Sequence, residues 1–228
     1  MADERWERYG AATGIVFVIL GVIAYIIAGP PPIPDAIQPG RVRTDMVAHY
    51  VDNSDSLVLS NYLWGVAGLF YFWFLGSLRS YLRQAEGGTG RLSAVAFGAG
   101  IAGGAVFSVG TLVSVALASD IAGAASEDVT LALHEVATHA YIYATFAFVV
   151  LAAATSVVGG RYRAFPGWLG WLGWLVALLT LLGSAAVFAE TGPLAFGGAL
   201  SVLGFAVFFL WFLALSLTVT QRAGHPAA

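Results

Sequence analysis

The chain has 228 residues, of which 59% are hydrophobic and 10% are charged. An ordinary soluble domain has roughly 45–50% apolar and about 25% charged residues, so this composition excludes a water-soluble globular protein. The net charge of -3 provides no basic surface for a polyanion, and we expect no nucleic acid partner. Because the chain contains no cysteine, it has neither disulfides, nor a thiolate nucleophile, nor thiolate metal ligands.

Six apolar stretches are each long enough to cross the hydrocarbon layer of a membrane, which takes about 20 residues. We therefore predict an all-α, polytopic integral membrane protein that forms one domain over residues 1–228. The predicted spans are residues 11–28, 57–78, 92–118, 129–158, 167–188 and 194–219. The first is expected to be a retained helix, since the leader before it carries more acids than arginines. It ends at Gly29 and a proline-rich run, whereas the fifth begins directly after Pro166.

The arginines predict the orientation of these spans. With a cytoplasmic N-terminus, only Arg41 and Arg43 fall on the outer side of the membrane. The other eight all fall on the cytoplasmic side: Arg5, Arg8, Arg79, Arg83, Arg91, Arg161, Arg163 and Arg222. The positive-inside rule then predicts that both termini are cytoplasmic and that the spans lie in an inner (plasma) membrane.

The segment between the first two spans, residues 29–56, is predicted to lie outside the cell. Its proline-rich half should be extended, and its second half should form a short extracytoplasmic amphipathic helix with Met46, Val47, Tyr50 and Val51 on the apolar side. This helix is expected either to lie flat on the outer membrane surface or to fold down as a lid. The polar residues 52–55 that follow are typical of a solvated turn rather than of a calcium loop.

Small residues recur along residues 92–118. Ala96, Gly100, Gly104 and Ser108 lie four apart, so they form one stripe on a helix, and Gly110, Ser114 and Ala118 extend a second stripe. Small side chains allow the backbones of neighbouring helices to approach closely in a membrane. We expect the tightest helix contact along the first stripe.

Polar side chains gather in the outer half of the fourth span. Glu135 and His139 share one helix face, and the adjoining face carries His134, Thr138 and Tyr141. Polar groups inside a membrane are costly and often functional, so these residues, with Asn61 and Tyr62 of the second span, are the candidate ligand-binding residues. A second reading remains open, in which the same side chains are merely paired within the structure.

No catalytic residue and no cofactor are predicted. His134 and His139 lie five positions apart, which does not match the two histidines of a zinc peptidase helix. A metal site would have to use His139 and Glu135 together with a donor from outside the span, such as His49.

These observations favour a non-enzymatic membrane protein that binds a small apolar or lipid-like molecule in an outward-facing cavity lined by the fourth span. Membrane lipids are the expected surroundings, and assembly into a homo-oligomer stays open. Three alternatives compete with this hypothesis: a proton-coupled small-molecule transporter, a membrane-embedded metal-dependent enzyme, and a partner subunit of a larger membrane complex.

Residues 72–100 (FWFLGSLRSYLRQAEGGTGRLSAVAFGAG) and 165–179 (FPGWLGWLGWLVALL) carry a family resemblance. They are similar to a family of uncharacterised multipass membrane proteins, a domain of unknown function, from high-GC bacteria. The resemblance extends from Tyr50 onward and implies a six-helix fold without implying an activity. The use of arginine at all ten basic positions agrees with a high-GC coding bias.

Overall fold

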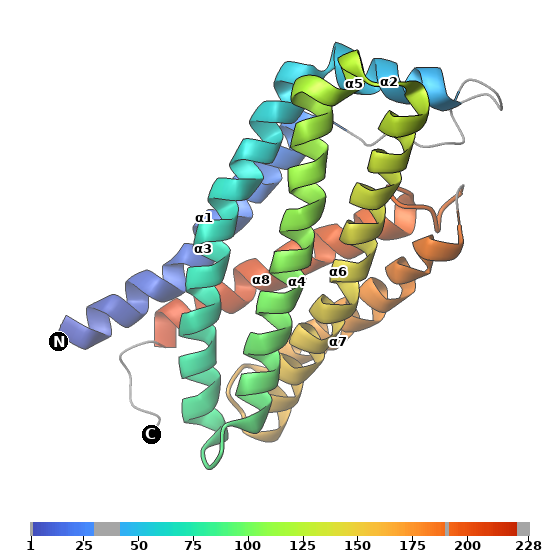
Figure 1. Cartoon of the computed structure of the whole chain (residues 1–228). Helices are drawn as coiled ribbons and strands as arrows, with labels where there is room; N and C mark the ends of the chain where they lie inside the picture. The colour runs from blue at the N-terminus through green and yellow to red at the C-terminus, as the bar shows by residue number, and fades with distance from the viewer. Residues whose placement is uncertain (1, 30–41, 190–191, 223–228) are drawn as a thin grey trace.

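The computed structural model describes residues 2–29, 42–189 and 192–222, and within these ranges the chain is helical apart from short connections (Figure 1). The proline-rich part of the predicted external segment, residues 30–41, lies outside the described residues. The elements in chain order are α1 (Ala2–Ala28), α2 (Val42–Asp52), α3 (Ser54–Glu86), α4 (Arg91–Ala116), the π-helical turn η2 (Leu117–Ile121), α5 (Ala122–Ala124), α6 (Glu127–Arg161), α7 (Gly167–Gly183), the 3-10 turn η3 (Ser184–Phe188) and α8 (Ala199–Arg222).

Six helical segments are long and apolar enough to cross a membrane, as predicted. They are Trp6–Ala28, Ser54–Glu86, Arg91–Ala124, Glu127–Arg161, Gly167–Phe188 and Ala199–Arg222. Several extend beyond the predicted bounds, because polar residues at their ends continue the helical hydrogen bonding outside the apolar stretch. The third span includes η2 and α5 and so continues to Ala124, beyond the expected end at 118.

The predicted start of the sixth span was wrong. Its helix, α8, begins at Ala199 rather than at residue 194. Gly197 has a φ of 80°, which an α-helix does not tolerate, and the backbone N–H of Leu200 bonds to the carbonyl of Pro193. A Cβ at Gly198 would lie 2.6 Å from the Gly192 carbonyl oxygen, so this tight turn requires glycine.

Aromatic side chains form the centre of the bundle. Phe212 of α8 is fully buried and lies 4.8 Å from Phe74 of α3 and 5.0 Å from Phe17 of α1, measured between ring centroids. Two buried hydroxyls fasten α1 to the same neighbours: Ser60 of α3 donates to the Ala24 carbonyl at 2.8 Å, and Ser216 of α8 donates to the Ala11 carbonyl at 2.6 Å. The first helix is therefore an integral part of the bundle.

The small-residue stripes of α4 face two different helices. A Cβ at Gly100 or Gly104 would lie 2.8 Å from Leu75 or Tyr71, so the first stripe packs against α3. Ser108, predicted to continue that stripe, is exposed and bonds to its own helix at the Gly104 carbonyl. The second stripe faces α6, where a Cβ at Gly110 would lie 2.7 Å from the ring of Tyr141.

The two ends of the bundle differ in chemistry. At one end, which we call the arginine end, the Ala164 carbonyl between α6 and α7 accepts hydrogen bonds from Tyr81 of α3 and Arg222 of α8. The opposite end, the α2 end, carries α2, η2 and α5 across the top of Figure 1. Since the spans number six, the start of the first helix and the end of the last helix both lie at the arginine end.

Candidate functional site

The helix α2 covers the first residues of α6 and the η2–α5 end of the third span. It contacts α6, α5 and η2, and its buried residues Met46 and Tyr50 pack with Leu57, Leu117, Ala118 and Ala122. Next to it, the Ser54 hydroxyl donates to the Ala118 carbonyl at 2.7 Å, which ties the start of α3 to the π-helical turn. Figure 1 shows α2 lying across the top of the bundle beside α5.

A hydrogen bond joins α2 to the interior face of α6. The Tyr50 hydroxyl lies 2.9 Å from Nδ1 of His134, and Nε2 of the same ring lies 3.4 Å from the Thr138 hydroxyl. A neutral imidazole satisfies both contacts when Tyr50 donates to Nδ1 and Nε2–H donates to Thr138. Of the two predicted histidines, His134 is therefore the one that faces into the bundle.

A second polar pair lies directly beside the first. The Ser114 hydroxyl of α4 is 3.1 Å from the Tyr141 hydroxyl of α6. The Tyr141 ring lies 5.0 Å from Phe107 and stacks on Phe196 at 5.8 Å. We call Tyr50, Ser114, His134, Thr138 and Tyr141 the polar cluster.

The packing of α2 against the bundle shifts the pKa values of two of its side chains. Burial raises the pKa of the Tyr50 hydroxyl, and the neighbouring Tyr141 adds to this effect while Ser114 opposes it. On the same helix, burial lowers the pKa of His49. Both shifts disfavour the charged form of these two side chains where α2 meets the bundle.

Glu135 and His139 lie on the adjoining, outward face of α6. Their side chains are 56% and 47% exposed, and Nδ1 of His139 donates to the Glu135 backbone carbonyl at 2.8 Å and lies 3.6 Å from the Glu135 carboxylate. The pair predicted from the i, i+4 spacing thus exists. It points away from the polar cluster.

The remaining predicted residues do not join the cluster. Asn61 donates to the Leu57 carbonyl of its own helix at 2.8 Å, and Tyr62 is 66% exposed. His49 packs edge-on against Tyr50, at 5.5 Å between ring centroids, rather than meeting Glu135. Within the described ranges, no group of three or more His, Asp or Glu side chains is arranged to hold a metal ion.

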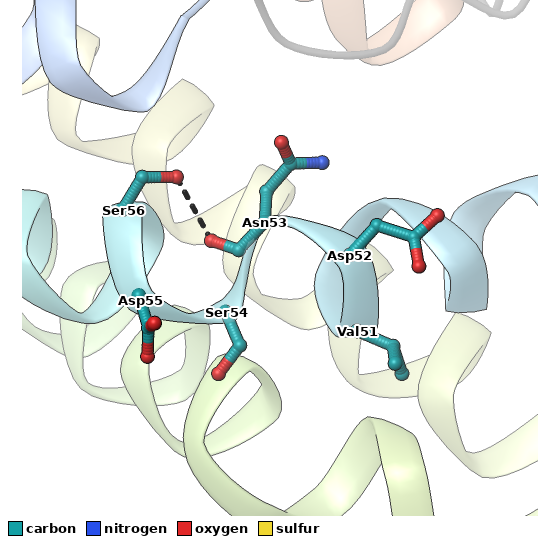
Figure 2. Close-up of a pocket in the computed structure, with 6 residues that line it drawn as sticks. All are labelled: Val51, Asp52, Asn53, Ser54, Asp55 and Ser56. Carbon is teal, nitrogen blue, oxygen red and sulfur yellow. Dashed lines mark hydrogen bonds between the residues drawn. The ribbon is translucent and has the colours of Figure 1, made fainter.

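A shallow hollow lies at the junction of α2 and α3 and is lined by residues 51–56 (Figure 2). The Ser56 hydroxyl donates to the Asn53 carbonyl at 2.9 Å. Figure 2 shows Asp52 and Asp55 pointing in different directions. The hollow contains none of the predicted ligand-binding residues.

Sequence reasoning missed two members of the polar cluster. Tyr50 was assigned to the apolar side of a short helix, and Ser114 to a stripe of small residues. In the structure Tyr50 is buried, and Gly110, in the same stripe as Ser114, meets Tyr141. The hydroxyls gave no further signal, because tyrosine and serine each serve in packing as well as in hydrogen bonding.

Comparison of the chain with models of protein families, with curated proteins and with solved structures finds no match. The geometry of the site is therefore the basis for the functional proposal that follows.

Proposed function

We propose that the protein binds a small, largely apolar or lipid-like molecule at the α2 end of its membrane bundle and catalyses no reaction. The proposal rests chiefly on the 2.9 Å hydrogen bond between Tyr50 and His134. This bond places a titratable imidazole of a membrane span beneath a helix that lies outside the spans. A partly buried polar group in a membrane bundle is costly and is commonly retained for function.

The polar cluster suits a single polar head group. Hydroxyls of Tyr50, Ser114 and Tyr141 and the His134 ring supply both donors and acceptors from three helices. The Phe107 and Phe196 rings on either side of Tyr141 offer an apolar surface for the rest of the molecule. Binding sites for small apolar ligands combine mostly apolar walls with a few convergent polar groups in this way.

Close packing beyond the cluster favours binding over transport. Toward the arginine end, Gly103 packs against Phe148 of α6, and Gly104 packs against Tyr71 of α3. A proton-coupled transporter needs a relay of ionisable groups through the membrane. The contacts named here are made by glycine and aromatic residues instead. A blind site that opens at the α2 end fits this arrangement better.

Two variants of α6 test the binding site. We expect His134→Phe to lose the co-purifying apolar molecule from protein isolated in detergent, because the ring nitrogens contact the head group. The matched control His139→Phe removes the same ring from the exposed face and is expected to retain it. Mass spectrometry of organic extracts measures both. The proposal is contradicted if wild type and His134→Phe contain equal amounts of the co-purifying molecule, or if only His139→Phe loses it.

We further propose that the α2 end faces the outside of a bacterial plasma membrane, with both termini in the cytoplasm. The arginines at the opposite end support this orientation. Because the chain has no cysteine, one introduced thiol reports one position. In intact cells, a membrane-impermeant maleimide should label Ser126→Cys before α6 and should not label Thr89→Cys between α3 and α4. The reverse pattern contradicts the orientation.

A further inference from the structure

The outward face of α6 combines an acid, an imidazole and large apolar side chains. Glu135 and His139 lie on it with four exposed apolar residues that follow the same helical periodicity. These are Val136, Tyr143, Phe146 and Val150, which are 52%, 60%, 44% and 42% exposed. This face is turned away from α2, α4 and α7, the helices that pack on α6.

The depth of the pair argues against lipid as its neighbour. With 35 residues, α6 is about 52 Å long at about 1.5 Å per residue, whereas the hydrocarbon layer is about 30 Å thick. A centred helix extends about 11 Å beyond the layer at each end. Glu135 follows Glu127, the first residue of α6, by about 12 Å, and His139 follows it by about 18 Å. The pair therefore lies at and just inside the hydrocarbon boundary, where an ionisable side chain almost always faces protein or water.

The hydrogen bonding of the pair is incomplete within one copy of the chain. Nδ1 of His139 donates to the Glu135 backbone carbonyl, so this nitrogen carries a proton. In the part of the chain that the structure describes, neither Nε2 of His139 nor the Glu135 carboxylate has a hydrogen-bond partner. Nε2 of His139, which is an acceptor, and the Glu135 carboxylate therefore face outward, one helical turn apart.

We infer that two copies of the chain associate through the outward face of α6, with Glu135 of each copy paired to His139 of the other. A two-fold axis along the membrane normal brings the same face of both copies together at the same depth. Identical residues of the two copies then lie at the same depth, so each Glu135 carboxylate reaches diagonally, by about 6 Å along the helix, to the second copy's His139 ring. One shared proton between Nε2 and the carboxylate satisfies both groups. The outward face of α6 is complementary in charge to the same face of a second copy. A lipid or an unrelated helix does not offer this complementarity.

This interface is independent of the proposed ligand site, since His134 lies on the inward face of α6, where it bonds to Tyr50 of α2. Ala132 lies on the outward face of α6 near the α2 end, and its methyl group is exposed. In α3, Leu59 is 49% exposed and follows the first residue of its helix by the same five positions, so it has a matching depth.

Single-cysteine cross-linking of the full chain in lipid nanodiscs and native membranes tests the interface. Ala132→Cys should form a disulfide-linked dimer on oxidation, and Leu59→Cys should stay monomeric. Adding Glu135→Gln or His139→Phe to Ala132→Cys should lower the dimer yield several-fold. The exchanged pair Glu135→His with His139→Glu should restore it, because the reciprocal contacts are preserved.

Four outcomes overturn the inference. They are a monomeric Ala132→Cys protein of native mass, equal cross-linking of Leu59→Cys, a dimer yield that Glu135→Gln and His139→Phe leave unchanged, and cross-linking of Ala132→Cys to a different protein. Circular dichroism of each variant shows whether it is folded. A variant that loses its helical signal is replaced by Glu135→Asp, which keeps the charge, shortens the reach across the interface and is likewise expected to lower the dimer yield.

Discussion

The Tyr50 hydroxyl lies 2.9 Å from Nδ1 of His134, although the two residues are 84 positions apart in the chain. This contact fastens α2, which lies outside the membrane spans, to the interior face of α6. It therefore couples the position of α2 to the packing of the polar cluster. The first two predictions below concern this coupling.

Replacing Tyr50 by Phe should loosen α2. The change removes the hydroxyl that bonds to His134 and leaves a partly buried ring nitrogen without a partner, which costs about 1–3 kcal/mol. Opening of α2 should then be at least about fivefold more frequent. Hydrogen exchange of residues 42–52 in nanodiscs measures this opening. Tyr62→Phe, which removes an exposed hydroxyl, should leave the exchange unchanged.

Acidification should weaken the docking of α2. Burial holds the pKa of His49 below the ordinary value of 6.5, which the ring regains when α2 undocks. The undocked state thus binds more protons at intermediate pH, so docking is fully stable above pH 6.5 and is weakened as the pH falls toward the lowered pKa. Hydrogen exchange of α2, corrected for the intrinsic effect of pH, should increase over this range.

His49→Asn is the control for this pH dependence. It should reduce the change measured between pH about 7.5 and about 5.5, since an amide does not titrate in this range. An identical pH response in wild type and His49→Asn excludes His49 as the source and assigns the response to another group.

Adding a side chain at Gly104 should destabilise the bundle. A Cβ there would lie 2.8 Å from the Tyr71 and Phe72 rings, so Gly104→Val forces α3 and α4 apart at a cost of about 1–3 kcal/mol. Thermal unfolding in detergent should show a lower midpoint. Gly98→Val is the matched control on the same helix, because a Cβ at Gly98 meets nothing within 4 Å. Equal midpoints for the two variants contradict the close α3–α4 contact.

Removing the Ser60 hydroxyl should weaken the attachment of α1. Ser60 is 2% exposed and donates to the Ala24 carbonyl, and interhelical hydrogen bonds in membranes contribute about 0.6 kcal/mol on average. Ser60→Ala should therefore lower the unfolding midpoint slightly and increase proteolysis within α1. Ser119→Ala removes an exposed hydroxyl that bonds only to its own helix and should change neither measurement.

The candidate site was only partly predictable from the sequence. The i, i+4 pair of Glu135 and His139 and the adjoining face of His134, Thr138 and Tyr141 follow from helix geometry alone. The sequence favoured His139 and Glu135 as the main ligand residues, whereas the structure places His134 under Tyr50. In a soluble helix, the polar side would reveal which face is exposed. In a membrane helix, lipid and protein interior are both apolar, so the pattern of hydrophobic residues does not distinguish them.

By itself, the sequence determined the all-α class and the existence and approximate positions of six spans. These follow from a local requirement, since each backbone polar group in hydrocarbon must be satisfied within its own helix. Only the tertiary structure decided that α2 covers α6, that Gly110 makes room for Tyr141, and which face of α6 turns inward. Those outcomes depend on contacts between segments distant in the chain, such as Tyr50 with His134, and complementary shape between helices has no signature in the composition of either one.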